Sequence, residues 1–437
     1  MRKKSTASAT LVLSLLAATA AHADEGAVGL YGVLDSAIAD IEHAMNFDPN
    51  HPVANNPTVT KGTQQAIGIL NGGMSATRWG MRGEESLGAG VKAIFLLEEG
   101  FNLGSGAVSN AAASIANNTA NGPGMSADSA IAGQLFNRGA YAGLASARYG
   151  TLTAGRQQSF FLDNIAVFDP MMGSQAFSPI GFSGTYGGGG ATEDSRTDNS
   201  LKYKVVLGDF TVGALYKFGG VAGQTSAVTA TEINAVYASG PLALQLGYQG
   251  FKDAFSMANA TGNGTVKATA QDTKGYMAAA KYVVDALTLR AGYEREEYTN
   301  PSDPTVDVAI TSLYGVPLAA PASVTAYPQQ KNLDVYWGGG GYEFTPNFTL
   351  LAGLYHVTQN NYDPAGCANR SQLARCSGAL NYYSLVGDFP LSKRSDVYAG
   401  MMKSTVSGGP AAAVANTPPA TSVTQNRILA LGFRHRF

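Results

Sequence analysis

The stretch RWGMRGEESLGAGVKAIFLLEEGF, residues 78–101, decides the fold of this chain. Its second half carries an apolar row at Val91, Ala93, Phe95 and Leu97. The row between them is mixed and contains Lys92, Ile94, Leu96 and Glu98. A period of two puts the two rows on opposite faces of a β-strand. The sequence therefore predicts a hairpin of strands 75–84 and 91–102, with one face toward lipid and the other toward a lumen.

The same pattern recurs along the chain and predicts sixteen strands. A first strand at 27–39 and a last strand at 425–437 flank seven hairpins. The other six hairpins are 136–144 with 150–157, 197–207 with 210–219, 231–238 with 242–251, 276–283 with 287–298, 334–344 with 348–358, and 380–387 with 396–404. Each hairpin closes through a tight turn, such as Gly208-Asp209.

Long segments rich in Ala, Asn, Gly, Ser and Thr join one hairpin to the next. They are residues 40–74, 103–135, 158–196, 220–230, 252–275, 299–333, 359–379 and 405–424. An even strand number with short turns at one end and long loops at the other is typical of outer-membrane barrels, and sixteen strands leave an aqueous channel. We expect an all-β antiparallel barrel with short periplasmic turns and long extracellular loops. Alternation alone leaves a soluble sandwich with one wet face as the alternative.

Composition and the N-terminal residues agree with a barrel in the outer membrane. Charged residues are 14% of the chain, against roughly 25% in an average soluble protein. A net charge of −2 gives no global field that would attract nucleic acid. A basic start at residues 2–4, an apolar stretch at 10–20 and the sequence Ala21-His22-Ala23 predict a signal peptide at 1–23 and a barrel domain at 24–437. A retained anchor is the alternative, but the apolar stretch is too short to span a bilayer.

The only two cysteines are Cys367 and Cys376. In an exported chain two close cysteines usually form a disulfide, which we expect in the seventh long loop. A metal site is the weaker interpretation, because two thiols without a nearby histidine make a poor zinc site. We expect neither a metal nor a cofactor.

Six segments of the chain resemble the general diffusion porins of Gram-negative bacteria. They are VGLYGVLDSAI at 28–38, the stretch at 78–101, NRGAYAGLASARYGTLTAGRQ at 137–157, RTDNSLKYKV at 196–205, LSKRSDVYAG at 391–400 and ILALGFRHRF at 428–437. The resemblance implies a sixteen-stranded barrel, usually a homotrimer, that passes small hydrophilic solutes and ions passively across the outer membrane. It also implies that the third loop folds into the lumen and narrows it.

Three arginines match porin positions that line the constriction: Arg78, Arg138 and Arg196. Alternation independently puts Arg78 and Arg196 on lumen faces. Further charged side chains expected in the lumen are Arg82, Glu84, Lys92, Glu98, Asp198 and Lys202. The alternative is that the arginines are rim or loop charges that bind lipid head groups.

The third loop departs from the porin pattern, in which acidic residues at the loop tip face the arginines. Residues 171–192 contain no charged side chain, and the acids Asp163, Asp169, Glu193 and Asp194 lie on the flanks. Because arginine rings favour anions in pores, the sequence predicts a weak anion preference. A solute-selective pore is the alternative.

The terminal residue Phe437 ends a strand whose apolar face carries Leu429, Leu431 and Phe433. The resemblance implies that this ending is the signal read by the barrel-assembly machinery, and an ordinary aromatic at the membrane interface is the alternative. An outer-membrane enzyme would need a nucleophile beside a base, and no Ser–His–acid set is suggested around the mature histidines. A secondary role of the long loops as adhesin or receptor stays open.

Overall fold

A computed structural model describes residues 28–44, 64–104, 106, 135–180, 196–220, 222–227, 229–261, 265–303, 312–313, 316–323, 325, 327–367, 375–410 and 425–437. The predicted signal peptide and the tract 187–190 lie outside these residues. No described helix is long and apolar enough to cross a membrane.

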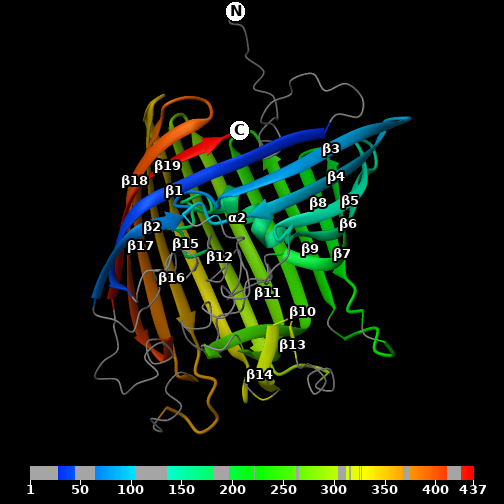
Figure 1. The fold of residues 1–437 in the computed structure, drawn as a ribbon, viewed down its shortest axis with the longest axis vertical. Coiled ribbons are helices and arrows are strands. Elements are labelled where there is room, and N and C mark those ends of the chain that lie inside the picture. Colours follow the sequence, from blue (N-terminus) through cyan, green and yellow to red (C-terminus); the bar gives the residue numbers. More distant parts are fainter. Residues whose placement is uncertain are drawn as a thin grey trace, which may run out of the picture.

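Sixteen antiparallel strands form the wall of a closed barrel (Figure 1). The first eight are β1 (Val28–Ala44), β3 (Arg78–Gly88), β4 (Val91–Gly100), β5 (Gly139–Ser146), β6 (Gly150–Gln158), β7 (Arg196–Leu207), β8 (Phe210–Lys217) and β9 (Ala230–Ser239). The second eight are β10 (Leu242–Thr261), β11 (Thr265–Val284), β12 (Leu287–Thr299), β15 (Lys331–Thr345), β16 (Phe348–Gln359), β17 (Gly378–Pro390), β18 (Ser395–Gly408) and β19 (Gln425–Arg436). The barrel closes because the first wall strand, β1, pairs with the last, β19. The predicted strand number and topology are confirmed.

Two predicted loops contain further strands. Within 40–74, β2 (Gln64–Asn71) pairs with β1 from Ser36 to Ala44, beyond the part of β1 that pairs with β3. β2 and β3 therefore lie end to end along one edge of β1, separated by residues 72–77. Within 299–333, β13 (Ser312–Leu313) pairs with β14 (Val316–Ser323), which also lies along β11.

The prediction of a long loop at 252–275 is also wrong. β10 continues to Thr261 and β11 begins at Thr265, so the two strands form a long hairpin through this segment. Backbone pairing satisfies the N–H and C=O groups of any sequence. A strand that lacks an apolar and a polar face can therefore form without leaving a period-two pattern in the sequence.

The tight turns form where the sequence predicts them. Gly208-Asp209 joins β7 to β8, and Gly208 has φ +63°. Glycine adopts this left-handed conformation without the clash of a Cβ atom, so a two-residue connection is possible there.

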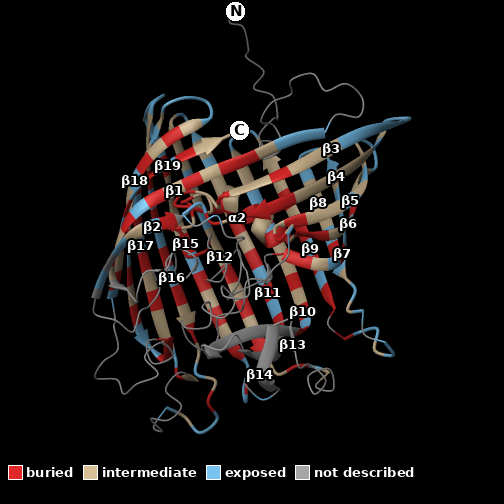
Figure 2. Ribbon diagram, in the orientation of Figure 1, coloured by how far each residue is buried: buried red, intermediate tan, exposed pale blue. Residues whose placement is uncertain are grey.

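The outer face of the wall carries the apolar residues. Exposed and buried positions alternate along the strands (Figure 2). Near the tight turns, Tyr342, Phe344, Phe348 and Phe389 form a chain of ring contacts. Toward the other end, Tyr293, Tyr336 and His356 form a second chain. Aromatic residues at both ends of an apolar band are typical of an outer-membrane barrel.

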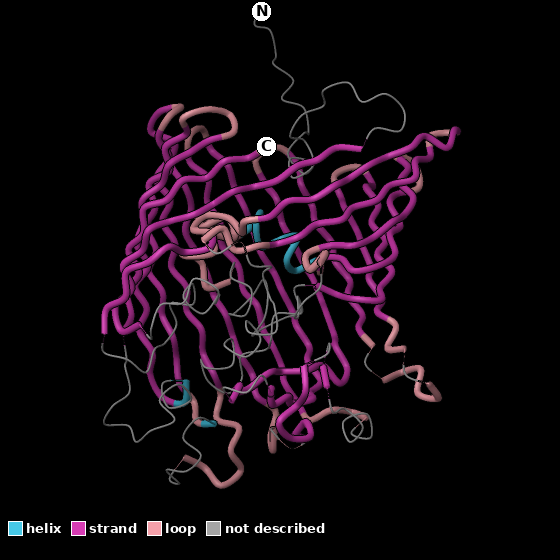
Figure 3. Tube along the Cα trace, viewed as in Figure 1, coloured by secondary structure: helices cyan, strands magenta, loops and turns pink. Residues whose placement is uncertain are grey.

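The core of the molecule lies inside the barrel. The third loop turns inward, and its helix α2 (Phe160–Phe168) and residues 169–180 occupy the lumen (Figures 1 and 3). Buried side chains of the loop pack against buried wall residues in one cluster, which includes Phe161, Ile165, Phe168, Met171, Phe177, Val335, Trp337, Tyr355, Tyr382 and Tyr398. The predicted fold of the third loop is confirmed. On β15–β18 the inner face is apolar where the loop covers it, and the charged residues Asp388 and Asp396 lie near the tight turn between β17 and β18.

Candidate functional site

A cluster of charged side chains is centred on Glu98 of β4. Its carboxylate accepts hydrogen bonds from Arg138 Nε at 2.8 Å and from the Tyr31 hydroxyl at 2.9 Å. Arg78 Nε lies 3.3 Å from the second carboxylate oxygen. The guanidinium group of Arg82 stacks over the Tyr31 ring at 5.0 Å. We call these five residues the Glu98 cluster.

The register of three neighbouring strands assembles the cluster. Gly80 of β3 lies opposite Tyr31 of β1 and opposite Glu98 of β4. A Cβ atom at Gly80 would lie only 2.9 Å from the Tyr31 ring, so glycine leaves the space through which the phenol reaches Glu98. Arg78 and Arg82 flank Gly80 on the same strand face.

The Glu98 cluster carries more positive than negative charge. It contains three guanidinium groups and one carboxylate, of which Arg78 and Arg138 bind the carboxylate directly, and arginine does not lose its proton in proteins. The cluster therefore cannot relieve its positive charge by titration.

The third predicted arginine is placed apart from the other two. Arg196 begins β7, is buried, and lies opposite Gln158 of β6. Arg138 precedes β5, so one intervening strand separates the elements that carry the two residues. The structure thus brings Arg78 and Arg138 onto one carboxylate and puts Arg196 farther along the wall.

The remaining predicted lumen charges form local pairs. Lys92 Nζ lies 2.6 Å from Glu84, and both side chains are half-exposed. Asp198 pairs with Arg156.

Lys202 of β7 reaches the third loop. Its Nζ lies 2.6 Å from Asp163 and 4.3 Å from the centre of the Phe160 ring. It therefore ties helix α2 to the wall.

The loop acids that the structure describes are bound to other groups than the arginines of the Glu98 cluster. Asp163 pairs with Lys202. Asp169 accepts hydrogen bonds from the Tyr355 hydroxyl at 2.5 Å and from the Gly173 N–H at 2.7 Å. Burial raises the pKa of Asp169, although these hydrogen bonds oppose the shift. Glu193 and Asp194 lie outside the described residues.

Sequence reasoning missed several polar side chains of the lumen region, among them Tyr31, Arg156 and Arg290. Tyr31 binds Glu98, Arg156 donates from Nε to the carbonyl of Asn137, and Arg290 donates from Nε to the carbonyl of Val167 in the third loop. Their roles depend on the register of neighbouring strands and on the path of the loop. In the sequence, only Tyr31 had a signal for its role, namely its alternation with Gly32 on β1.

The cysteines and the terminal residue have defined partners. The structure joins Cys367 and Cys376 in a disulfide. Phe437 exchanges two backbone hydrogen bonds with Gly32, each 3.1 Å. The last residue is thereby held on β1, at the seam where the barrel closes.

Known proteins resemble this chain in sequence and in fold. Residues 7–409 match the family model described as Gram-negative porin. An outer membrane porin of Bordetella pertussis is 30% identical over 298 residues, which are 65% of this chain and 68% of that protein.

Solved structures share the fold at low sequence identity. An anion-selective porin from Comamonas acidovorans has a TM-score of 0.61 at 17% identity, over 94% of this chain and 100% of that one. OmpT, an outer membrane protein of Vibrio cholerae, has a TM-score of 0.59 at 15% identity, over 95% of this chain and 99% of that one. Together with the closed barrel, these matches show that the chain is a diffusion channel of the bacterial outer membrane and belongs to the Gram-negative porin family.

Proposed function

We propose that this channel passes small hydrophilic solutes and ions with a weak preference for anions. The Glu98 cluster carries the proposal, because two of its arginines, Arg78 and Arg138, bind the single carboxylate of Glu98. The preference is modest because wall charges of both signs remain. At physiological salt the Debye length is about 8 Å, so only charges close to the narrowest level act on a passing ion. Arg78, Arg138 and Arg196 are the proposed constriction residues.

The comparison with solved porins supports the same preference. The porin from Comamonas acidovorans is described as anion-selective, and its fold matches 94% of this chain. In this chain the described acids of the third loop bind Lys202 and Tyr355, which leaves Glu98 as the carboxylate bound to the arginine pair.

Replacing the three arginines with serine tests the charge assignment. The variant Arg78→Ser, Arg138→Ser, Arg196→Ser should lose the anion preference in planar bilayers, measured as the reversal potential in a salt gradient. The matched control is Arg148→Ser, which removes an exposed arginine from the tight turn between β5 and β6. An unchanged preference in the triple variant would show that other residues select the ions.

A solute-selective pore remains the second candidate within the channel class. A site built for one solute would make transport of that solute saturable, whereas a general pore gives rates proportional to concentration. Flux of several sugars into liposomes as a function of concentration distinguishes the two.

We also infer that the chain has no catalytic activity of its own. Membership in a channel family supports this inference, and the proposed conduction needs no covalent step. Hydrolysis of ester or peptide substrates by the purified, folded barrel, abolished by a single substitution, would contradict it.

We propose that three copies assemble through the outer face of β1, β2 and β19. Four exposed aliphatic residues are neighbours there: Ile38 (63% exposed), Ile67 (70%), Ile69 (47%) and Leu431 (63%). Among the described residues, β2 pairs with β1 alone, which favours contact of its other edge with a second copy. The rest of the outer face contacts lipid, and the terminal strand with Phe437 is the proposed contact for the barrel-assembly machinery.

A further inference from the structure

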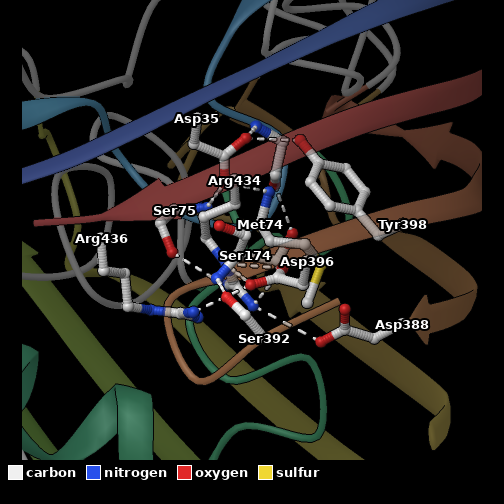
Figure 4. A network of polar contacts seen from close by, with 12 residues as sticks. Asp35, Met74, Ser75, Ser174, Asp388, Ser392, Asp396, Tyr398, Arg434 and Arg436 are labelled. Carbon is white, nitrogen blue, oxygen red and sulfur yellow. Dashed lines mark hydrogen bonds and ion pairs between the residues drawn. The ribbon is translucent and has the colours of Figure 1, made fainter. Parts of the chain in front are cut away.

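A buried carboxylate on the first strand binds a backbone segment inside the barrel. Asp35 of β1 is fully buried and accepts hydrogen bonds from the N–H groups of Gly73 at 2.9 Å, Met74 at 3.1 Å and Ser75 at 2.7 Å. The Tyr398 hydroxyl donates a fourth at 2.5 Å. Figure 4 labels Asp35 together with its partners Met74, Ser75 and Tyr398. The bound segment is residues 72–77, which we call the β2–β3 connection.

The β2–β3 connection is fixed to β1 at a second point. The Thr77 hydroxyl donates to the carbonyl of Asp35 at 2.7 Å and accepts from the Asp35 N–H at 3.0 Å. The Arg434 guanidinium donates to the Ser75 hydroxyl at 3.0 Å, and Arg434 also binds Asp396 (Figure 4). The connection therefore has a fixed conformation tied to β1 and β19 at the seam of the barrel.

The third loop rests on this connection. The carbonyl of Gly73 accepts hydrogen bonds from the Ser174 hydroxyl at 2.7 Å and from the Ala176 N–H at 2.9 Å. Met74 lies in the same buried cluster as Met171 and Phe177. A path of direct hydrogen bonds thus runs from Asp35 through Gly73 to the loop that fills the lumen.

Close packing around Gly73 restricts the conformation of the backbone that carries these hydrogen bonds. A Cβ atom at Gly73 would lie 2.1 Å from the Tyr398 hydroxyl oxygen, so the segment fits against Tyr398 only as glycine. The Tyr398 ring in turn contacts the Phe177 ring edge-on, with 6.4 Å between centroids. The same tyrosine therefore contacts the carboxylate, the connection and the loop.

We propose that Asp35 is a positioning residue of the pore: it holds the β2–β3 connection, and through the Gly73 carbonyl it fixes where residues 174–176 of the third loop lie. Asp35 thereby controls the free cross-section of the channel without lining the narrowest level itself. The proposal does not depend on the ion preference, because it concerns the position of the loop and not its charge.

The test combines Asp35→Asn with a loop-side substitution. Asp35→Asn keeps the shape of the side chain but replaces one acceptor oxygen with a donor that faces backbone N–H groups. We expect hydrogen exchange at the amides of residues 174–177 to rise on the order of ten-fold, as for the loss of one charge-assisted hydrogen bond. The ratio of raffinose to glucose permeation in liposome swelling should rise with it. The matched control Asp40→Asn alters an outward carboxylate of the same strand and should change neither value.

A double variant separates positioning from a general structural role. Ser174→Ala removes one loop contact and should raise exchange at the same amides. In Asp35→Asn with Ser174→Ala the effect should not exceed that of the larger single change, because both act on one path. If Asp35→Asn fails to fold, Ser174→Ala and Tyr398→Phe must still change the sugar ratio. An unchanged ratio and unchanged exchange in folded variants would overturn the proposal.

Discussion

At the scale of single residues, Glu98 limits the positive charge of the pore wall. Its carboxylate binds Arg78 and Arg138 together, so Glu98→Gln should expose both guanidinium groups to passing anions. A unit charge about 7 Å from an ion in water contributes roughly 0.6 kcal/mol. Salt with a Debye length of about 8 Å more than halves this energy. Because the charge acts with opposite sign on chloride and potassium, we expect the chloride-to-potassium permeability ratio to rise about two- to three-fold.

The control for this prediction is Glu84→Gln, which removes a carboxylate paired with Lys92 where both side chains are half-exposed. The chloride-to-potassium permeability ratio of this variant should change less than that of Glu98→Gln. A ratio that falls in Glu98→Gln would mean that the arginines do not face the permeating ions.

The sequence showed which residue types line the wall but not their partners. Period-two alternation indicated lumen positions for Arg78 and Glu98. The pairing of Arg78, Arg138 and Tyr31 on one carboxylate depends on register across β1, β3 and β4, which alternation does not specify. Asp163 could be recognised as an acid of the third loop, but its partner Lys202 lies 39 positions away.

At the scale of elements, the seam between β1 and β19 depends on a glycine, Gly32, which lies against the ring of Phe437. A Cβ atom at Gly32 would lie 2.4 Å from the Phe437 ring and 2.8 Å from the carbonyl oxygen of Arg78. Gly32→Val should therefore displace Phe437 and reduce the yield of heat-modifiable barrel, as deletion of Phe437 should.

The neighbouring Gly29 provides the control, because a Cβ atom there meets only the carbonyl oxygen of Arg82 at 4.0 Å. Gly29→Ala should assemble normally. Electrophoresis of membrane fractions with and without heating measures the yield. Normal assembly after deletion of Phe437 would leave this residue as an ordinary interface aromatic.

The disulfide between Cys367 and Cys376 should matter for its loop and not for the barrel. In the chain-entropy model, a closed loop of about ten residues is stabilised by roughly 2.5 kcal/mol, and this loop can open while the wall stays folded. The double change Cys367→Ser, Cys376→Ser should make the loop between β16 and β17 more sensitive to protease. Conductance should stay the same, and a change in conductance would show that this loop reaches the pore.

The wall strands were predictable from sequence because lipid and water impose opposite demands on their two faces. The strands β2, β10 and β11 show the limit of this signal. In β2, the outward Ile67 and Ile69 alternate with Gly68 and the buried Leu70, so no polar face marks the strand. The extensions of β10 and β11 pair through their backbones, which leaves no pattern in the side chains.

At the scale of the whole molecule, assembly into trimers should depend on the aliphatic face of β1, β2 and β19. Ile67→Arg puts a charge into the proposed interface, whereas Leu354→Arg puts one on the outer face of β16, where Leu354 is also exposed. An arginine on the lipid face costs about 2–4 kcal/mol at mid-membrane, which a sixteen-stranded barrel should tolerate. Only Ile67→Arg should abolish detergent-resistant trimers. Loss of trimers in both variants, or in neither, would contradict the assigned interface.

The central claim, a diffusion channel with a weak anion preference, is tested most directly by the reversal potential of the wild-type channel in a potassium chloride gradient. Arginines that stay charged and share a single carboxylate should make chloride more permeable than potassium. The account predicts a zero-current potential displaced modestly toward the equilibrium potential of chloride, with a shift that shrinks as salt screens the wall. A displacement toward the equilibrium potential of potassium would contradict it.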